Sequence, residues 1–123
     1  MSSTLQVNSQ QQTNAPVQLM HVSGRLDAGT VNIMEKALSD ALAKGNKVLV
    51  LDLAELAYIS SSGLRALLTA RRAAHARKGD VLISNMKRSV RDVFDMVGFS
   101  AVFGIHENVE QALHAATKIA GPN

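Results

Sequence analysis

Short apolar runs alternate with longer amphipathic segments along this 123-residue chain, and this alternation constrains its fold more than any other feature. The run at 47–53 (KVLVLDL) is apolar apart from its ends, which is typical of a strand covered on both faces. Helix-like segments precede and follow it, so neighbouring strands must be joined by crossover connections. The chain is therefore predicted to be an α/β protein with a largely parallel sheet.

Periodicity and capping residues place the individual elements. Strands are predicted at 4–7, 15–22, 47–53, 81–83 and 101–103. Helices are predicted from Asp27 as N-cap towards Lys44, from Ser60 to near Gly79, from Ser89 as capping residue to Gly98, and from Asn108 to about Ala116. The first two strands are expected to form an amino-terminal hairpin, so the sheet is mixed but mostly parallel, with about four helices packed on it.

Length and composition fit one domain over residues 1–123, with flexible ends expected at 1–3 and 117–123. The absence of cysteine excludes disulfides, thiolate metal sites and a cysteine nucleophile, and favours a cytoplasmic location. A net charge of +3 and an aromatic content of 3% do not indicate a nucleic-acid partner. The apolar stretch around 48–59 is interrupted by Asp52 and Glu55, so no direct membrane insertion is expected.

Three adjacent serines, Ser60, Ser61 and Ser62, stand where a buried strand is expected to give way to a helix. An N-cap explains one of these hydroxyls but not three. A helix N-terminus also favours phosphate, because it presents unpaired N–H groups and a partial positive charge. The same context suits a serine nucleophile, but no glycine stands two places before a candidate and no histidine is spaced as its base. No catalytic residue, metal site or cofactor is therefore predicted.

Several further segments, taken in order along the chain, fit one known pattern. They are Gly24-Arg25-Leu26-Asp27, Val48 to Leu53, Ile59-Ser60-Ser61-Ser62-Gly63-Leu64, Gly79, and Gly98-Phe99. Together they resemble the STAS-domain anti-sigma factor antagonists, over the stretch from about Leu5 to Ala116. The resemblance implies a STAS-like fold and a partner-switching regulator rather than an enzyme.

The resemblance also implies a mechanism and a site. Members of this family bind an anti-sigma factor that is also a serine protein kinase, and so free a sigma factor for transcription. The kinase phosphorylates a serine at the start of the second helix, which ends the binding, and a serine phosphatase reverses the modification. Carried onto this chain, the acceptor is Ser61, with Ser60 and Ser62 as alternatives because Ser60 stands where the family often has aspartate. Asp27 matches the acidic position that lies near the acceptor.

One face of the second helix is predicted to contact the partner. It lies opposite the leucine stripe and is small and only mildly polar: Ser62, Arg65, Ala66, Thr69, Ala73 and Ala76. A phosphate dianion buried against such a face costs several kcal/mol unless it is paired. The residues predicted to bind the partner are Asp27, Ser60, Ser62, Gly63, Arg65, Ala66 and Thr69.

Three other functions are weaker alternatives. The chain fits a soluble accessory subunit of a membrane transporter complex, since STAS domains also occur there. It fits less well a small serine-dependent enzyme, for the reasons given above. Nucleic-acid binding would depend on the basic residues, which are typical of a solvated helix end. These are Arg71, Arg72, Arg77 and Lys78, followed by Lys87, Arg88 and Arg91.

Overall fold

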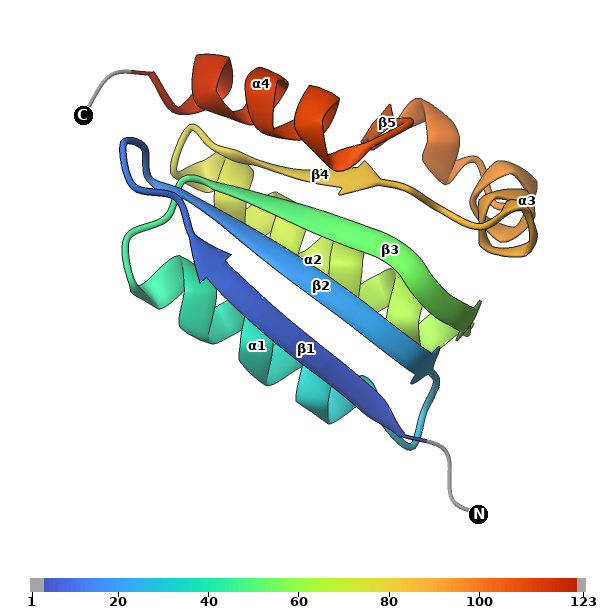
Figure 1. The fold of residues 1–123 in the computed structure, drawn as a ribbon. Helices are drawn as coiled ribbons and strands as arrows, with labels where there is room; N and C mark the ends of the chain where they lie inside the picture. Colours follow the sequence, from blue (N-terminus) through green and yellow to red (C-terminus); the bar gives the residue numbers. More distant parts are fainter. Residues whose placement is uncertain (1–3, 122–123) are drawn as a thin grey trace.

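A five-stranded sheet in the order β1-β2-β3-β4-β5 forms the centre of the protein (Figure 1). The computed structural model describes residues 4–121. The strands are β1 (Leu5–Gln11), β2 (Val17–Leu26), β3 (Val48–Ile59), β4 (Asp80–Ser84) and β5 (Gly104–His106). The helices are α1 (Val31–Ala43), α2 (Ser61–Ala76), α3 (Arg88–Met96) and α4 (Val109–Ala120), with a 3-10 turn η1 at Phe99–Ala101.

The strand pairing confirms the predicted mixed sheet. β1 and β2 form an antiparallel hairpin, whereas β2, β3, β4 and β5 pair in parallel. The order of elements along the chain is the one that alternation of apolar runs and amphipathic segments predicts. Each parallel pair is joined by a helix, as crossover connections require.

Helices cover both faces of the sheet (Figure 1). Two apolar clusters lie between the helices and the sheet. The larger cluster lies between the sheet and α1, α2 and α3, and the smaller one lies under α4. Residues Val48–Leu51 of β3 contribute to both clusters and are 0% exposed. Burying a side chain of this size contributes about 1.5–3 kcal/mol, so the central strand supplies a large share of the stability.

β3 is longer than the predicted strand at 47–53 and ends only at Ile59. Two register shifts against β2 occur in its second half, so inward side chains fall at Leu53, Leu56 and Ile59 instead of at every second position. Because of that spacing, the second half of β3 lacks the alternation of apolar and polar residues by which a strand is predicted. β4 pairs with β3 only as far as Asp52, so the carboxyl ends of β2 and β3 extend past β4 and β5.

Three predicted element boundaries are wrong for local reasons. Asp27 begins a turn, in which the N–H groups of Thr30 and Val31 bond its carbonyl at 3.1 and 2.9 Å, and Thr30 is the N-cap of α1. Ser89 lies inside α3, because the Lys87 carbonyl accepts the first helical bonds. The last strand is 104–106 rather than 101–103, because residues 99–101 turn and bury Phe103 against Phe94 at 5.9 Å between ring centroids.

The chain ends were predicted to be flexible. Residues 117–120 belong to α4, so the carboxyl-terminal segment does not become irregular at residue 117. Residues 1–3 and 122–123 lie outside the described residues. Asn108 caps α4 as predicted, with its side chain accepting a hydrogen bond from the Gln111 N–H at 2.9 Å.

Candidate functional site

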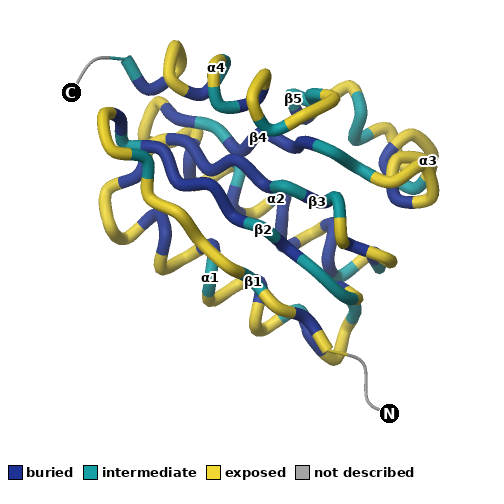
Figure 2. The backbone as a smooth tube through the Cα atoms, in the orientation of Figure 1, coloured by how far each residue is buried: buried dark blue, intermediate teal, exposed yellow. Residues whose placement is uncertain are grey.

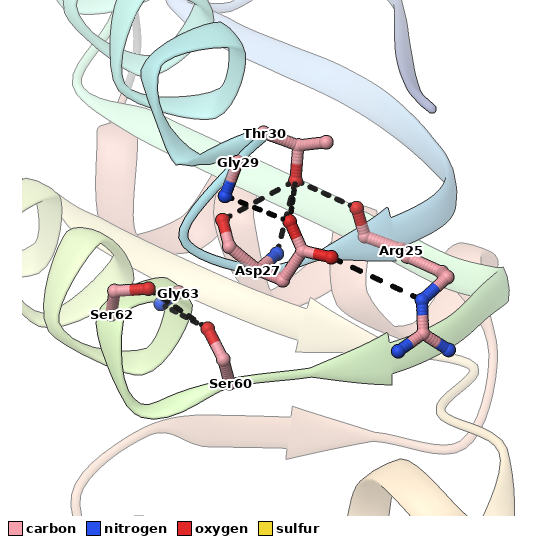
Figure 3. Close-up of polar contacts among 7 residues, drawn as sticks. All are labelled: Arg25, Asp27, Gly29, Thr30, Ser60, Ser62 and Gly63. Atoms are coloured by element: carbon pink, nitrogen blue, oxygen red, sulfur yellow. Dashed lines mark hydrogen bonds and ion pairs between the residues drawn. The ribbon is translucent and has the colours of Figure 1, made fainter. Parts of the chain in front are cut away.

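The three adjacent serines lie where β3 ends and α2 begins. Ser60 has an extended backbone (φ −95°, ψ 173°) and is the N-cap, its hydroxyl accepting from the Gly63 N–H at 3.3 Å. The Ser60 N–H donates to the Leu26 carbonyl at 2.9 Å, which ties the start of α2 to the end of β2. The hydroxyls of Ser60 and Ser62 lie 2.9 Å apart (Figure 3). Two of the three hydroxyls are therefore engaged in local structure.

Ser61 differs from both of its neighbours. It is the first residue of α2 and is exposed. Among the hydrogen bonds of residues 4–121, none involves its hydroxyl, in contrast to Ser60 and Ser62. A hydroxyl in this position is accessible to a second protein, and its modification would break no internal bond.

Gly63 is buried and sets how closely α2 approaches the sheet. A Cβ atom at this position would lie 2.7 Å from Leu26 Cγ and 3.0 Å from Ile59 Cγ1. Both of these neighbours are core side chains, so they cannot move aside without cost. Gly63 therefore positions the serine turn and does not itself reach the protein surface.

Asp27 lies in the turn between β2 and α1, beside the serine turn (Figure 3). Its Oδ1 atom accepts a hydrogen bond from the Gly29 N–H at 3.0 Å, and its Oδ2 atom lies 4.0 Å from Arg25 Nε. The side chain is 25% exposed. The structure thus brings Asp27 together with Ser60, Ser62 and Gly63, through the bond that joins Ser60 to Leu26.

Thr30 holds this turn in shape and was not predicted from the sequence. Its hydroxyl donates to the Arg25 carbonyl at 2.7 Å and accepts from the Asp27 N–H at 3.0 Å. The residue is 4% exposed and makes no side-chain cap for α1. A threonine at an N-cap normally accepts a hydrogen bond from an N–H group of its own helix. The signal available in the sequence was the spacing of Thr30, three residues after Asp27.

The predicted partner face of α2 is divided in the structure. Arg65, Thr69, Ala73 and Ala76 are exposed and Ser62 is half-buried, as a contact surface requires. Ala66 is only 5% exposed and lines a hollow of about 260 Å³ between α1 and α2, together with Leu38 and Ala70. The prediction that Ala66 lies on the exposed face is wrong, because α1 packs closer to α2 than a helical pattern alone reveals.

The first turn of α2 favours an anion, whereas the carboxylate of Asp27 beside it opposes one. α2 has no acidic residue in its first turn, and its N-terminus carries the partial positive charge of the helix dipole.

Within residues 4–121, no three His, Asp or Glu side chains lie close enough together to hold a metal ion. No helix in the same stretch is long and apolar enough to cross a bilayer.

Comparison with known proteins assigns the family. The STAS domain family model matches residues 6–112, which is most of the chain. The chain belongs to the STAS domain family. The expected STAS fold and its site elements, the β2–α1 turn and the start of α2, all lie within the matched segment.

Individual STAS relatives include regulators of sigma factors by name. The chain is 34% identical over 101 residues to BtrV of Bordetella bronchiseptica, named as an anti-sigma factor antagonist, covering 82% of this chain and 86% of that protein. It is 29% identical to the anti-sigma-B factor antagonist of Listeria monocytogenes, covering 72% of this chain and 77% of that protein.

Solved STAS structures share the fold. The anti-sigma factor antagonist SpoIIAA in its unphosphorylated form superposes with a TM-score of 0.74 at 22% identity, covering 88% of this chain and 93% of that chain. Bacillus SpoIIAA in its phosphorylated form gives a TM-score of 0.67 at 20% identity, covering 93% of this chain and 100% of that chain. Both forms of that protein therefore have the fold described here.

Proposed function

We propose that this STAS protein is an anti-sigma factor antagonist that acts by partner switching. When unphosphorylated, it binds an anti-sigma factor that is also a serine protein kinase, and so frees a sigma factor for transcription. Phosphorylation of Ser61 by that kinase ends the binding, and a serine phosphatase restores it. Because its partners regulate transcription, we infer that the protein works in the cytoplasm.

One observation supports Ser61 as the acceptor above the other two serines. Its hydroxyl is exposed and has no hydrogen-bond partner among the described residues, whereas the hydroxyls of Ser60 and Ser62 bond each other and Ser60 also caps α2. A kinase reaches Ser61 without disturbing the helix start. Ser60 and Ser62 remain the alternatives.

The expected mechanism is electrostatic and leaves the fold unchanged. In the unphosphorylated state the partner covers Ser61 together with Arg65, Thr69 and the Asp27 turn. Phosphate adds about −1.5 to −2 charges at that point, and Asp27 adds a further negative charge nearby. A dianion enclosed by a partner without new counter-charges costs several kcal/mol, so the complex separates. The protein works through binding and not through catalysis of its own.

Replacement of Ser61 tests the proposal with purified proteins. Ser61→Ala is expected to abolish phosphate incorporation by the kinase and to retain binding, because it removes only the acceptor. Ser61→Asp is expected to weaken binding, since it places a negative charge at the same point. Ser62→Ala is the matched control and should still accept phosphate. Phosphate mapped to Ser60 or Ser62 in the wild-type protein would contradict the assignment.

A further inference from the structure

Arg25 and Tyr58 form a stacked pair at the carboxyl ends of β2 and β3. The guanidinium carbon of Arg25 lies 4.3 Å from the centroid of the Tyr58 ring, and the two residues pair in the strand register. Both side chains are exposed, Tyr58 to 40%. Tyr58 is the single tyrosine of the chain, while the three phenylalanines pack against one another in or beside the core.

The pair lies on a part of the sheet that none of the described helices covers. Leu26 and Ile59, the residues next in sequence, point into the core under α1 and α2, so Arg25 and Tyr58 point to the other face. α4 covers that face only over the opposite ends of β2 and β3, near Val17 and Val48. The strand ends away from α4 contain exposed and half-exposed residues (Figure 2).

The Arg25–Tyr58 pair is close enough to Ser61 to share one interface. Tyr58 precedes Ser61 by three residues of extended chain, which span about 10 Å at roughly 3.3 Å per residue. An ordinary interface covers about 800 Å² on each partner, which corresponds to a disc of about 16 Å radius. A partner centred on Ser61 therefore reaches the pair when it extends over the ends of β2 and β3.

The guanidinium of Arg25 is held in place, but its hydrogen-bond donors are not all used. Within residues 4–121 its only ion-pair contact is Asp27 Oδ2, 4.0 Å from Nε, which is beyond hydrogen-bond distance. Contact with the ring restrains the guanidinium, and its Nη groups make no hydrogen bond among these residues. A planar, preoriented guanidinium suits a bidentate carboxylate and loses little entropy on binding.

We propose that the Arg25–Tyr58 pair is a second part of the partner-binding surface, where Arg25 receives a carboxylate of the anti-sigma factor. This inference rests on the proposed function, because the partner is the same protein. Tyrosine and arginine are also the residue types most enriched at positions that dominate binding energy. The pair adds affinity in the unphosphorylated state and takes no part in accepting phosphate.

Calorimetric titration of the purified anti-sigma factor with unphosphorylated variants tests the proposal. Arg25→Ala and Tyr58→Ala are each expected to weaken binding about tenfold, the loss typical of residues that contribute more than about 1 kcal/mol. Arg25→Lys should weaken it nearly as much, since an ammonium has no planar pair of donors, whereas Tyr58→Phe should retain binding. Lys118→Ala and Ile119→Ala, at exposed positions on α4, are the controls and should bind like the wild type.

The outcomes separate this inference from the proposed function. If Arg25→Ala and Tyr58→Ala bind like the wild type, and phosphorylation still releases the wild type, the pair is not an interface and the switch stands. If Arg25→Ala leaves binding unchanged and shifts only the 31P resonance of phosphorylated Ser61, Arg25 interacts with the phosphate of its own chain. That result would overturn the inference. If the wild type does not bind the anti-sigma factor, both proposals fail. Thermal unfolding of each variant shows that the fold is retained.

Discussion

At the scale of single residues, neighbouring side chains of one type have different physical roles. Ser60 caps a helix, Ser62 bonds Ser60, and Ser61 is exposed without an internal bond among the described residues. The sequence alone shows three equivalent hydroxyls, and only the turn geometry distinguishes them. The same holds for Thr30, whose hydroxyl bonds the preceding turn instead of its own helix.

Thr30→Val is expected to destabilise the protein and to slow phosphorylation of Ser61. The substitution leaves the partly buried Arg25 carbonyl and Asp27 N–H without their partner, which costs about 1–3 kcal/mol. Chemical denaturation measures the loss, and initial rates of phosphate transfer by the kinase measure the displacement of Asp27. Thr30→Ser keeps the hydroxyl and should restore the rate. An unchanged rate in Thr30→Val would show that the turn does not position Asp27 for the kinase.

At the scale of the elements, the start of α2 combines a structural serine, Ser60, with the proposed phosphate acceptor, Ser61. Ser60→Ala is expected to lower the free energy of unfolding by about 1 kcal/mol, since it removes the N-cap. Ser61→Ala should change it by less than about 0.5 kcal/mol, as expected for a surface substitution that breaks no bond. Urea denaturation of the two variants measures the difference. Equal losses would mean that Ser61 also supports the helix.

The elements themselves were largely predictable, and their ends were not. The core of β3 and the helical faces follow from local hydrophobic patterns. The second half of β3 does not, because its inward positions depend on register shifts against β2. The start of α1 depends on which hydroxyl bonds which backbone group around Asp27 and Thr30. Such choices are decided by contacts between segments and leave no periodic trace in the sequence.

At the scale of the whole molecule, the site lies at the carboxyl ends of the strands, away from the part of the sheet that α4 covers. The resemblance to STAS proteins brought Asp27 and Ser61 to attention from the sequence. It could not reveal Arg25 beside Tyr58, because the two are 33 positions apart and meet only through the pairing of β2 with β3. The predicted exposure of Ala66 is wrong, because the sequence pattern does not show that α1 packs beside α2 and covers this residue.

The fold also explains why a switch here needs no rearrangement of the core. The serine turn is held by bonds to β2 and by the packing of Gly63 on Leu26 and Ile59, and Ser61 takes no part in either. A phosphate on Ser61 therefore changes the charge of the surface while the scaffold beneath it keeps its contacts. We expect the phosphorylated protein to unfold at nearly the same temperature as the unphosphorylated one.

The most direct test of the account is the affinity of the purified anti-sigma factor for the protein with and without one phosphate on Ser61, measured by calorimetry. The account predicts that the phosphate weakens binding by at least about 100-fold. This is near the upper end of the change in affinity that one site usually causes at another. A loss below about fivefold, which is roughly 1 kcal/mol, is too small to exchange partners and would contradict the proposed switch.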